Sequence, residues 1–146
     1  SAVRMVNATT TQLGAPLSRS TLPEVTLLAA TAPAAATSGA ILPVALAYQL
    51  DQPVDGELHW FVQLLSSDNY PLALVDTMPA AGYLHFPDLP VAEPQTEHVA
   101  LQLPTNMPSG RYTLIAGLYD PATGERLRLP NGRDYVELQT VTVVGP

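Results

Sequence analysis

The stretch GRYTLIAGLYDPATGERLRLPNG, residues 110–132, decides the fold of this chain. Four residues spaced two apart share one face of a predicted strand: Tyr112, Leu114, Ala116 and Leu118. Residues 120–124 predict a type I turn, with Pro121 at its second position and Gly124 where a positive φ costs little. Residues 125–129 are then expected to return antiparallel to the first strand.

A second turn follows at Asn131-Gly132, a strong hairpin signal because both residue types tolerate positive φ. Residues 135–144 are rich in Val and Thr and predict the closing strand. No obvious nucleophile, metal cluster or phosphate loop interrupts residues 110–132. We therefore interpret this stretch as structural scaffold and not as part of an active site.

Further short strands are predicted over residues 25–30, 41–50, 57–65, 70–77 and 99–103. Within 41–50, Pro43 falls on the face opposite the apolar stripe, which indicates an edge position or a bulge. Residues 30–40, ATAPAAATSGA, predict a loop, because Pro33 and the Thr-Ser-Gly sequence near the end of the segment disfavour a helix. Residues 78–95 carry four prolines and predict an irregular crossing segment.

Short strands, regular turn signals and the lack of an amphipathic helical pattern predict an all-β fold. The expected architecture is an immunoglobulin/fibronectin-III-like antiparallel β-sandwich of about 7–9 strands. Residues 1–23 are interpreted as a lead-in segment with room for one edge strand around residues 3–6. Residues 24–146 are expected to form a single β-sandwich domain.

The amino-acid composition excludes several classes of binding partner and several kinds of functional site. A formal net charge of −7 argues against nucleic acid and against an anionic membrane surface, since both need a basic footprint. The chain has no cysteine, which excludes disulfides, thiolate metal sites and a cysteine nucleophile. It has no apolar run of about 18 residues, so no membrane span is predicted within it. It begins at Ser1 without methionine, which leaves room for an upstream targeting or membrane segment.

Two aromatic residues are predicted to have structural roles. Trp60 lies in the middle of a strand on its apolar face, like the buried tryptophan of immunoglobulin-like sandwiches. Tyr112 begins its strand after Pro-Ser-Gly-Arg, a spacing similar to the tyrosine corner of those domains. Leu114 stands where antibody domains place a cysteine. A sugar-stacking platform is the alternative for Trp60.

Catalytic and metal-binding patterns are weak. The histidines His59, His85 and His98 lack ligand spacing to a carboxylate or to one another, and His59 and His98 are expected to face solvent. No Gly-x-Ser-x-Gly elbow, calcium loop or phosphate-binding glycine loop occurs. The acidic residues cluster in turns, where aspartate is common for structural reasons. We expect no catalytic residue, no metal and no cofactor.

Four aromatic residues in or beside turns keep a binding role open: Tyr70, Tyr83, Phe86 and Tyr119. If two or three of them share an exposed face, they could stack on a sugar ring or on an apolar anchor of a protein partner. The alternative is that they cap the ends of the sandwich.

The segments ELHWFVQLLSSDNYPLALVD (57–76) and LPTNMPSGRYTLIAGLYDPATGERL (103–127) carry a family resemblance. Over about residues 41–144 the chain resembles β-sandwich domains appended to bacterial multi-pass membrane glycosyltransferases of the protein-mannosyltransferase-like type. The resemblance implies an extracytoplasmic accessory domain. It carries over no catalytic residue, because that chemistry belongs to the membrane portion of those proteins.

Three hypotheses about function follow. The first is a noncatalytic β-sandwich accessory or recognition domain of a membrane or cell-surface protein, outside the cytoplasm, with a protein or glycan partner. The second is a carbohydrate-binding module that uses the turn aromatics. The third is a small hydrolase, which needs a carboxylate pair or a Ser-His pair within hydrogen-bond reach. The identity of the ligand and the oligomeric state stay open.

Overall fold

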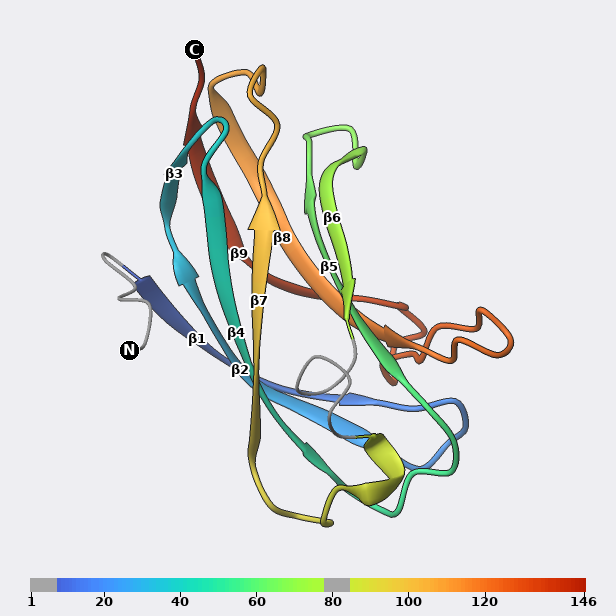
Figure 1. Cartoon of the computed structure of the whole chain (residues 1–146). Helices are drawn as coiled ribbons and strands as arrows, with labels where there is room; N and C mark the ends of the chain where they lie inside the picture. Colours follow the sequence, from blue (N-terminus) through green and yellow to red (C-terminus); the bar gives the residue numbers. More distant parts are fainter. Residues whose placement is uncertain (1–7, 78–84) are drawn as a thin grey trace.

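The computed structural model describes residues 8–77 and 85–146, which fold into two β-sheets packed face to face (Figure 1). One sheet has the strand order β1-β2-β4-β7 and the other β3-β9-β8-β5-β6. The strands are β1 (Ala8–Leu17), β2 (Val25–Pro33), β3 (Ala35–Thr37), β4 (Ile41–Leu50), β5 (His59–Leu65), β6 (Pro71–Thr77), β7 (Gln95–Gln102), β8 (Gly110–Tyr119) and β9 (Val136–Val144). A short 3-10 helix, η2 (Phe86–Asp88), precedes β7. The predicted all-β sandwich is confirmed.

The strand order is that of an immunoglobulin-like sandwich. Strands β9-β8-β5-β6 follow the G-F-C-C′ order of such domains, and β2-β4-β7 follow A-B-E. Pairing is antiparallel throughout except between β3 and β9, which run parallel. Trp60 therefore lies on strand C and Tyr112 near the start of strand F, the positions that these residues hold in immunoglobulin-like domains.

The core lies between the two sheets and is built from the alternating stripes of the strands. On β4 the buried residues are Leu42, Val44, Leu46, Tyr48 and Leu50. Opposite them Trp60 is fully buried, and its ring meets that of Tyr48 edge-on with 5.2 Å between centroids. Burial, and then the negative charge of the buried Glu97, raise the pKa of the Tyr48 hydroxyl to about 12. Tyr48 therefore stays neutral in the core at physiological pH.

Pro43 lies in a central strand but at a place where only one neighbour pairs with it. β4 pairs with β7 along residues 41–48, and Pro43 faces Ala100 there. The pairing of β4 with β2 reaches only Ala45. Pro43 is therefore locally at an edge, where its missing N–H costs no ladder hydrogen bond on the β2 side.

The loop predicted for residues 30–40 is present only at residues 38–40, and the prediction is wrong over the remainder. β2 continues to Pro33, and β3 follows directly and pairs with β9 in the other sheet. The chain thus changes sheets at Ala34, whose carbonyl oxygen accepts a hydrogen bond from Thr142 N–H at 2.9 Å. Ala30 and Ala32 point into the core. Alanine and threonine differ little in hydropathy, so the alternation of buried and exposed residues could not be recognised in this part of the sequence.

The segment expected as a lead-in contains a long edge strand. β1 pairs antiparallel with β2 from Ala8 to Leu17, and Leu17 is fully buried. Residues 3–6, where an edge strand was expected, lie outside the described residues. Residues 8–17 therefore belong to the sandwich, in a strand whose threonine-rich outer half carries no apolar stripe.

The two turns of the β8–β9 connection are both built on a type I turn followed by a glycine. Gly124 N–H and Thr123 N–H donate to Asp120 O, and Gly124 has φ +77°. In the second turn Gly132 N–H donates to Leu129 O, and Gly132 has φ +88°. Asn131 does not adopt the positive φ that was expected of it. The reason is Pro130, whose fixed φ favours the type I turn over the mirror-image turn.

Tyr112 ties the start of β8 to the preceding loop. Its hydroxyl donates a hydrogen bond to Pro108 O at 2.6 Å, four residues upstream. This is the bond that defines a tyrosine corner. Leu114, two residues further on, is fully buried at the position of the antibody cysteine.

A second, smaller apolar cluster lies on the outer face of the five-stranded sheet. It consists of Phe61, Leu65 and Ile115. The β8–β9 connection folds over it, with the Arg126 guanidinium 4.1 Å from the centroid of the Phe61 ring. The same ring covers Gly117, where an added Cβ would come within 2.4 Å of Phe61 Cζ.

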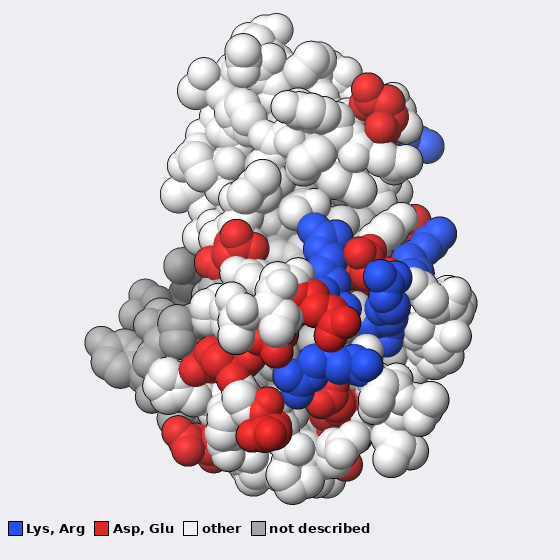
Figure 2. Space-filling view, turned by 90° about the vertical axis from the view of Figure 1, so that its right-hand side faces the viewer, with Lys and Arg blue, Asp and Glu red and all other residues white. Residues whose placement is uncertain are grey.

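Charged side chains are distributed unevenly over the molecule (Figure 2). On the face shown they gather in the lower part, and few appear in the upper part. Three of the ion pairs lie within or between the β1–β2 turn and the β8–β9 connection, and involve Arg19 and Arg126. A fourth joins Arg133 of the β8–β9 connection to Glu137 at the start of β9. We call the end of the sandwich formed by residues 18–24, 51–58 and 120–135 the charged end.

Candidate functional site

The three turn aromatics that the structure describes do not share one exposed face. Phe86 is fully buried against Tyr48, so it packs in the core and the binding role considered for it is wrong. Tyr70 is 64% exposed in the β5–β6 turn, next to the end of β5. Tyr119 pairs with His59 at the opposite end of β5. Tyr83 lies outside the described residues.

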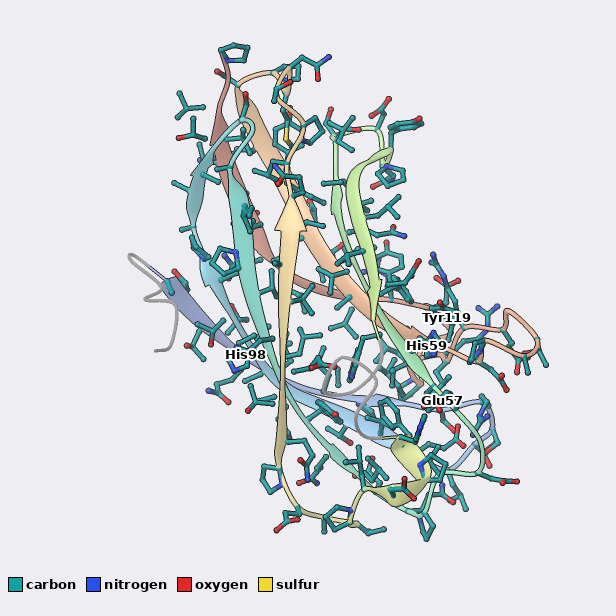
Figure 3. The ribbon with its side chains drawn as sticks, viewed as in Figure 1. Glu57, His59, His98 and Tyr119 are labelled. Carbon is teal, nitrogen blue, oxygen red and sulfur yellow. The ribbon has the colours of Figure 1, made fainter. Side chains whose placement is uncertain are left out.

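Tyr119 is the member of this set with polar surroundings. Its hydroxyl lies 3.3 Å from His59 Nδ1, and the two rings meet edge-on (Figure 3). Burial, and then the charge of Asp76, raise the pKa of the Tyr119 hydroxyl. The Tyr119 ring also packs on Phe61. Because its ring is held on two sides and only partly exposed, Tyr119 can offer a ligand its hydroxyl and one ring edge.

The other histidines are separated from this pair. His98 is exposed on β7, in the four-stranded sheet (Figure 3). His85 contacts the carboxylate of Glu57, a partner 28 residues away that sequence spacing could not indicate. Within residues 8–77 and 85–146, no three His, Asp or Glu side chains come together as a metal site, and no helix is long and apolar enough to cross a membrane.

Arg19 holds the loops of the charged end together. Its guanidinium donates to Glu24 Oε1 at 2.7 Å and to Asp120 Oδ2 at 3.2 Å, and it reaches the carbonyl oxygen of Asp55 at 3.4 Å. Burial alone would raise the pKa of Glu24, but the hydrogen bonds and charge of Arg19 outweigh it and lower that pKa. In turn the hydrogen bond with Glu24 raises the pKa of Arg19. One side chain thus links the β1–β2 turn, the β4–β5 loop and the start of the β8–β9 connection.

A two-residue bridge joins the two sheets beside this network. Ser18 N–H donates to Arg128 O at 3.0 Å, and Arg128 N–H donates to Ser18 O at 2.8 Å. Arg126 forms a second antiparallel bridge, with Tyr119 at the end of β8, which is flanked by hydrogen bonds from Leu127 N–H to Leu118 O and from Asp120 N–H to Glu125 O. The chain from Arg126 to Arg128 therefore connects the end of β8 to the end of β1, and the charged end is closed by backbone hydrogen bonds.

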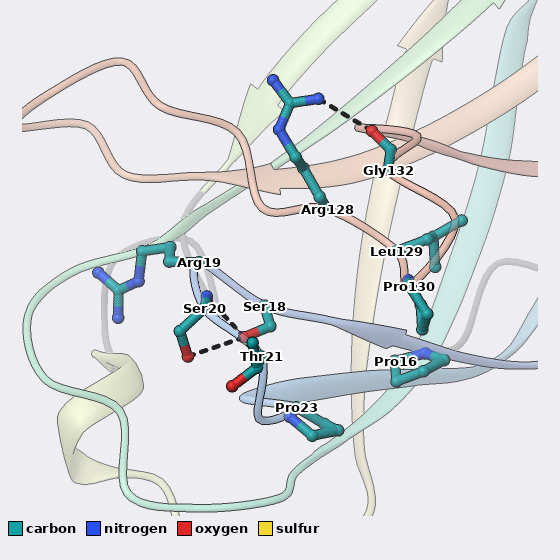
Figure 4. A pocket seen from close by; sticks show the side chains of 10 residues that line it. All are labelled: Pro16, Ser18, Arg19, Ser20, Thr21, Pro23, Arg128, Leu129, Pro130 and Gly132. Atoms are coloured by element: carbon teal, nitrogen blue, oxygen red, sulfur yellow. Dashed lines mark hydrogen bonds between the residues drawn. The ribbon is translucent and has the colours of Figure 1, made fainter.

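A groove of about 390 Å³ lies over this bridge, between the β1–β2 turn and the second turn of the β8–β9 connection (Figure 4). Its lining residues are Pro16, Ser18, Arg19, Ser20, Thr21, Pro23, Arg128, Leu129, Pro130 and Gly132. The prolines and Leu129 supply apolar surface, and the hydroxyl and guanidinium groups supply polar surface. Such a mixture suits a ligand that is polar at its edges and apolar on its faces.

The polar groups of the groove are partly engaged within the protein. Ser18 Oγ donates to Leu22 O and accepts a hydrogen bond from Ser20 N–H, which shapes the turn. Arg128 is exposed and uses Nη1 to donate to Gly132 O at 2.9 Å (Figure 4). That is one of five N–H donors, so most of the guanidinium can face an acceptor on a ligand.

Neither Arg19 nor Arg128 was among the site residues expected from sequence. The segment RLRLPNGR, residues 126–133, did carry a signal, because three arginines occur within eight residues of an acidic chain. Its alternation with leucine places Leu127 in the core and Arg126 and Arg128 outside. Arg19 had no such signal, since its partners Asp55 and Asp120 are distant in sequence.

Comparison with known proteins supports the fold. No family model matches the chain, and no curated protein matches it. Among solved structures, the C-terminal domain of wzt is similar over 95% of this chain and 79% of that chain, with a TM-score of 0.58 and 12% identity. A CARDB domain of the PF1109 protein from Pyrococcus furiosus, in complex with di-metal ions, matches 93% of this chain and 100% of that chain, with a TM-score of 0.49 and 13% identity. A β-glucuronidase from glycoside hydrolase family 2 matches 72% of this chain and 10% of that chain, with a TM-score of 0.42 and 8% identity. At these identities the similarity shows a shared β-sandwich fold and nothing further.

Proposed function

We propose that this chain is a noncatalytic recognition domain that works outside the cytoplasm as an accessory to a membrane or cell-surface protein. The fold is consistent with an accessory role, since the β-sandwich is similar to the C-terminal domain of wzt over 95% of this chain and 79% of that chain. The absence of cysteine is compatible with an oxidising compartment, because no thiol is exposed to unwanted oxidation.

The observation that carries the recognition role is the groove at the charged end. Its two walls come from turns far apart in sequence, and the Ser18–Arg128 bridge joins them directly below the groove. Arg19 fixes the neighbouring loops through Glu24 and Asp120. Loops that are held in place before binding lose less conformational entropy when a ligand arrives. These contacts support a recognition role for the charged end, because they hold its loops in place before a ligand binds.

The location is tested on the natural protein in intact cells. An epitope tag placed in the β5–β6 turn, residues 66–70, lies at the end remote from the groove. We expect added protease or antibody to reach the tag without breaking the inner membrane. A tag that becomes accessible only after complete lysis would overturn the extracytoplasmic assignment.

A carbohydrate is the ligand class that the groove favours most. Proline rings and Leu129 offer apolar contact to sugar ring faces, and the Arg128 guanidinium suits the carboxylate of an acidic sugar. Tyr119 adds a hydroxyl and a ring edge at the same end of the molecule, where Arg19 binds the adjacent Asp120.

A glycan array that includes uronic-acid-containing and neutral oligosaccharides tests this ligand class. Arg128→Ala should weaken binding to an acidic glycan about tenfold or more, because a charge-assisted hydrogen bond is lost. Arg111→Ala is the matched control, since Arg111 is exposed at the start of β8, away from the groove. No binding by the parent chain, or an equal loss in both variants, would reject the carbohydrate ligand and leave a protein partner to be tested by the same two variants.

A further inference from the structure

Strand β6 forms one free edge of the five-stranded sheet. It pairs with β5 on one side, and among the described residues its other side makes no backbone hydrogen bond. Its residues 71–75, PLALV, carry no charge. A row of unpaired backbone groups on an uncharged strand is a template for pairing with another strand.

The other three sheet edges carry features that oppose such pairing. β1 has a register shift between Gln12 and Ala15 around Gly14, and then Pro16. β3 has only three residues. β7 points the carboxylate-bearing Glu97 inward, where it is 5% exposed. Bulges, prolines, short length and inward charges are the usual means of protecting an edge.

On β6 such features lie at the two ends of the strand, where Asp76 stands near the C-terminal end. Pro71 starts the strand, and the register shift opposite Leu64 and Leu65 lies at the same end. Further along the strand, the side chain of Leu74 is 57% exposed on the outer face of the sheet. Tyr70, which directly precedes the strand, is 64% exposed. The middle of β6 therefore combines free backbone groups with the exposed apolar side chain of Leu74.

We propose that β6 pairs antiparallel with β6 of a second copy of this chain, about a twofold axis near Leu74, which joins the two five-stranded sheets into one. A twofold contact requires a surface that is complementary to itself. An antiparallel pair centred on Leu74 brings the two Leu74 side chains together and places Asp76 opposite Leu72 of the partner, so no like charges face each other.

The charge distribution keeps most like charges away from a contact between two copies at this edge. Two chains of net charge −7 repel each other, and that repulsion is weakest where charged groups are far from the contact. The side of the molecule shown in Figure 2 has few charged side chains in its upper part, whereas the ion pairs of Arg19, Arg126 and Arg133 lie at the charged end. The groove at the charged end stays open in both copies.

Sedimentation equilibrium over a range of protein concentrations tests the dimer. We expect the parent chain to show a reversible increase towards twice the monomer mass. Leu74→Arg should weaken the association at least about tenfold, because it places two like charges across the twofold axis. Leu22→Arg is the matched control, since Leu22 is similarly exposed at 66% but lies in the β1–β2 turn. A parent chain that stays monomeric, or a dimer that Leu74→Arg leaves intact, would overturn the proposal.

Cysteine cross-linking gives an independent readout of the strand pairing. The chain has no native cysteine, so a single introduced thiol reports one contact. Leu74→Cys should form an intermolecular disulfide under mild oxidation, since paired residues near the axis bring their Cβ atoms within disulfide range. Leu22→Cys should stay largely monomeric. Equal rates of cross-linking for the two variants would show that the contact does not involve β6.

Discussion

At the scale of single residues, Trp60 fills the middle of the core and does not reach the surface. It is fully buried and packs edge-on against Tyr48. Trp60→Ala should lower the free energy of unfolding by about 3–5 kcal/mol, because it leaves a large cavity between the sheets. Chemical denaturation followed by circular dichroism measures the loss. Tyr70→Ala, at an exposed aromatic, should stay within about 0.5 kcal/mol of the parent chain. Similar stability for both variants would contradict the core position of Trp60.

The hydrogen bond of Tyr112 at the start of β8 should make a measurable contribution to the stability of the domain. Tyr112→Phe keeps the ring and removes the hydroxyl that donates to Pro108 O. We expect a loss of about 1 kcal/mol, which is typical for a single hydrogen bond. The thermal unfolding of Tyr112→Phe is compared with that of Tyr70→Phe, which removes an exposed hydroxyl. The difference between the two variants gives the contribution of the Tyr112 hydrogen bond to stability. No difference between the two variants would mean that the corner does not stabilise the domain.

At the scale of elements, the packing of the Phe61 ring of β5 against β8 requires a residue without a side chain at Gly117. The Phe61 ring occupies the space that a Cβ at Gly117 would need. Gly117→Ala should therefore displace Phe61 and destabilise the domain by about 1–3 kcal/mol. The double variant Gly117→Ala with Phe61→Leu should lose less stability than the sum of the losses of the two single variants, because the smaller side chain at position 61 relieves the clash. Simple additivity, measured by denaturation of all four chains, would show that the two residues are not in contact.

The Arg19 network should make the connections of the charged end sensitive to acid. Arg19 lowers the pKa of Glu24 below its value of 4.5 in the unfolded chain. This contribution is therefore fully present above about pH 4.5 and is lost as the pH falls through the lowered pKa of the folded state. Glu24→Gln should flatten the decline of stability in that window. Denaturation midpoints measured between pH 6 and pH 3, roughly one unit beyond each side of the transition, give the comparison. An unchanged pH profile would contradict the ion pair.

Sequence patterns predicted the elements whose alternation contrasts large apolar with polar residues. β4, β5, β8 and β9 have such stripes, and they lie where the pattern put them. β3 and the end of β2 were missed, because alanine and threonine alternate there without that contrast. The turn predicted at Asn131-Gly132 is present, but Asn131 does not take a positive φ, since the fixed φ of Pro130 at the second turn position favours a type I turn.

The candidate site was much less accessible to sequence reasoning than the fold. Phe86 lies near several prolines in sequence and still packs in the core, because η2 turns it inward against Tyr48. Arg19, Asp55 and Asp120 come together only through the crossing of the two sheets. Contacts between loops depend on the relative position of whole strands, and local periodicity contains no information about that position.

At the scale of the whole molecule, the first strand is part of the domain. Deletion of residues 1–17 removes the buried side chains of Ala15 and Leu17 and uncovers the β2 edge. We expect a loss of more than about 3 kcal/mol, since the buried apolar side chains of β1 are removed and apolar residues of β2 become exposed. Differential scanning calorimetry of the shortened chain measures it. Unfolding as cooperative and as stable as that of the parent chain would support a dispensable lead-in instead.

The Ser18–Arg128 bridge also has a consequence for the order in which the chain folds. It joins segments from opposite ends of the sequence, whereas most of β4, β5, β6 and β8 pair with nearer neighbours. Closing a long loop costs more chain entropy and is slow unless other contacts have already brought the ends together. We therefore expect the walls of the groove to meet late, after the sheets have assembled. A ligand that needs both walls would then bind only molecules that have completed folding, so that recognition itself selects against incompletely folded chains.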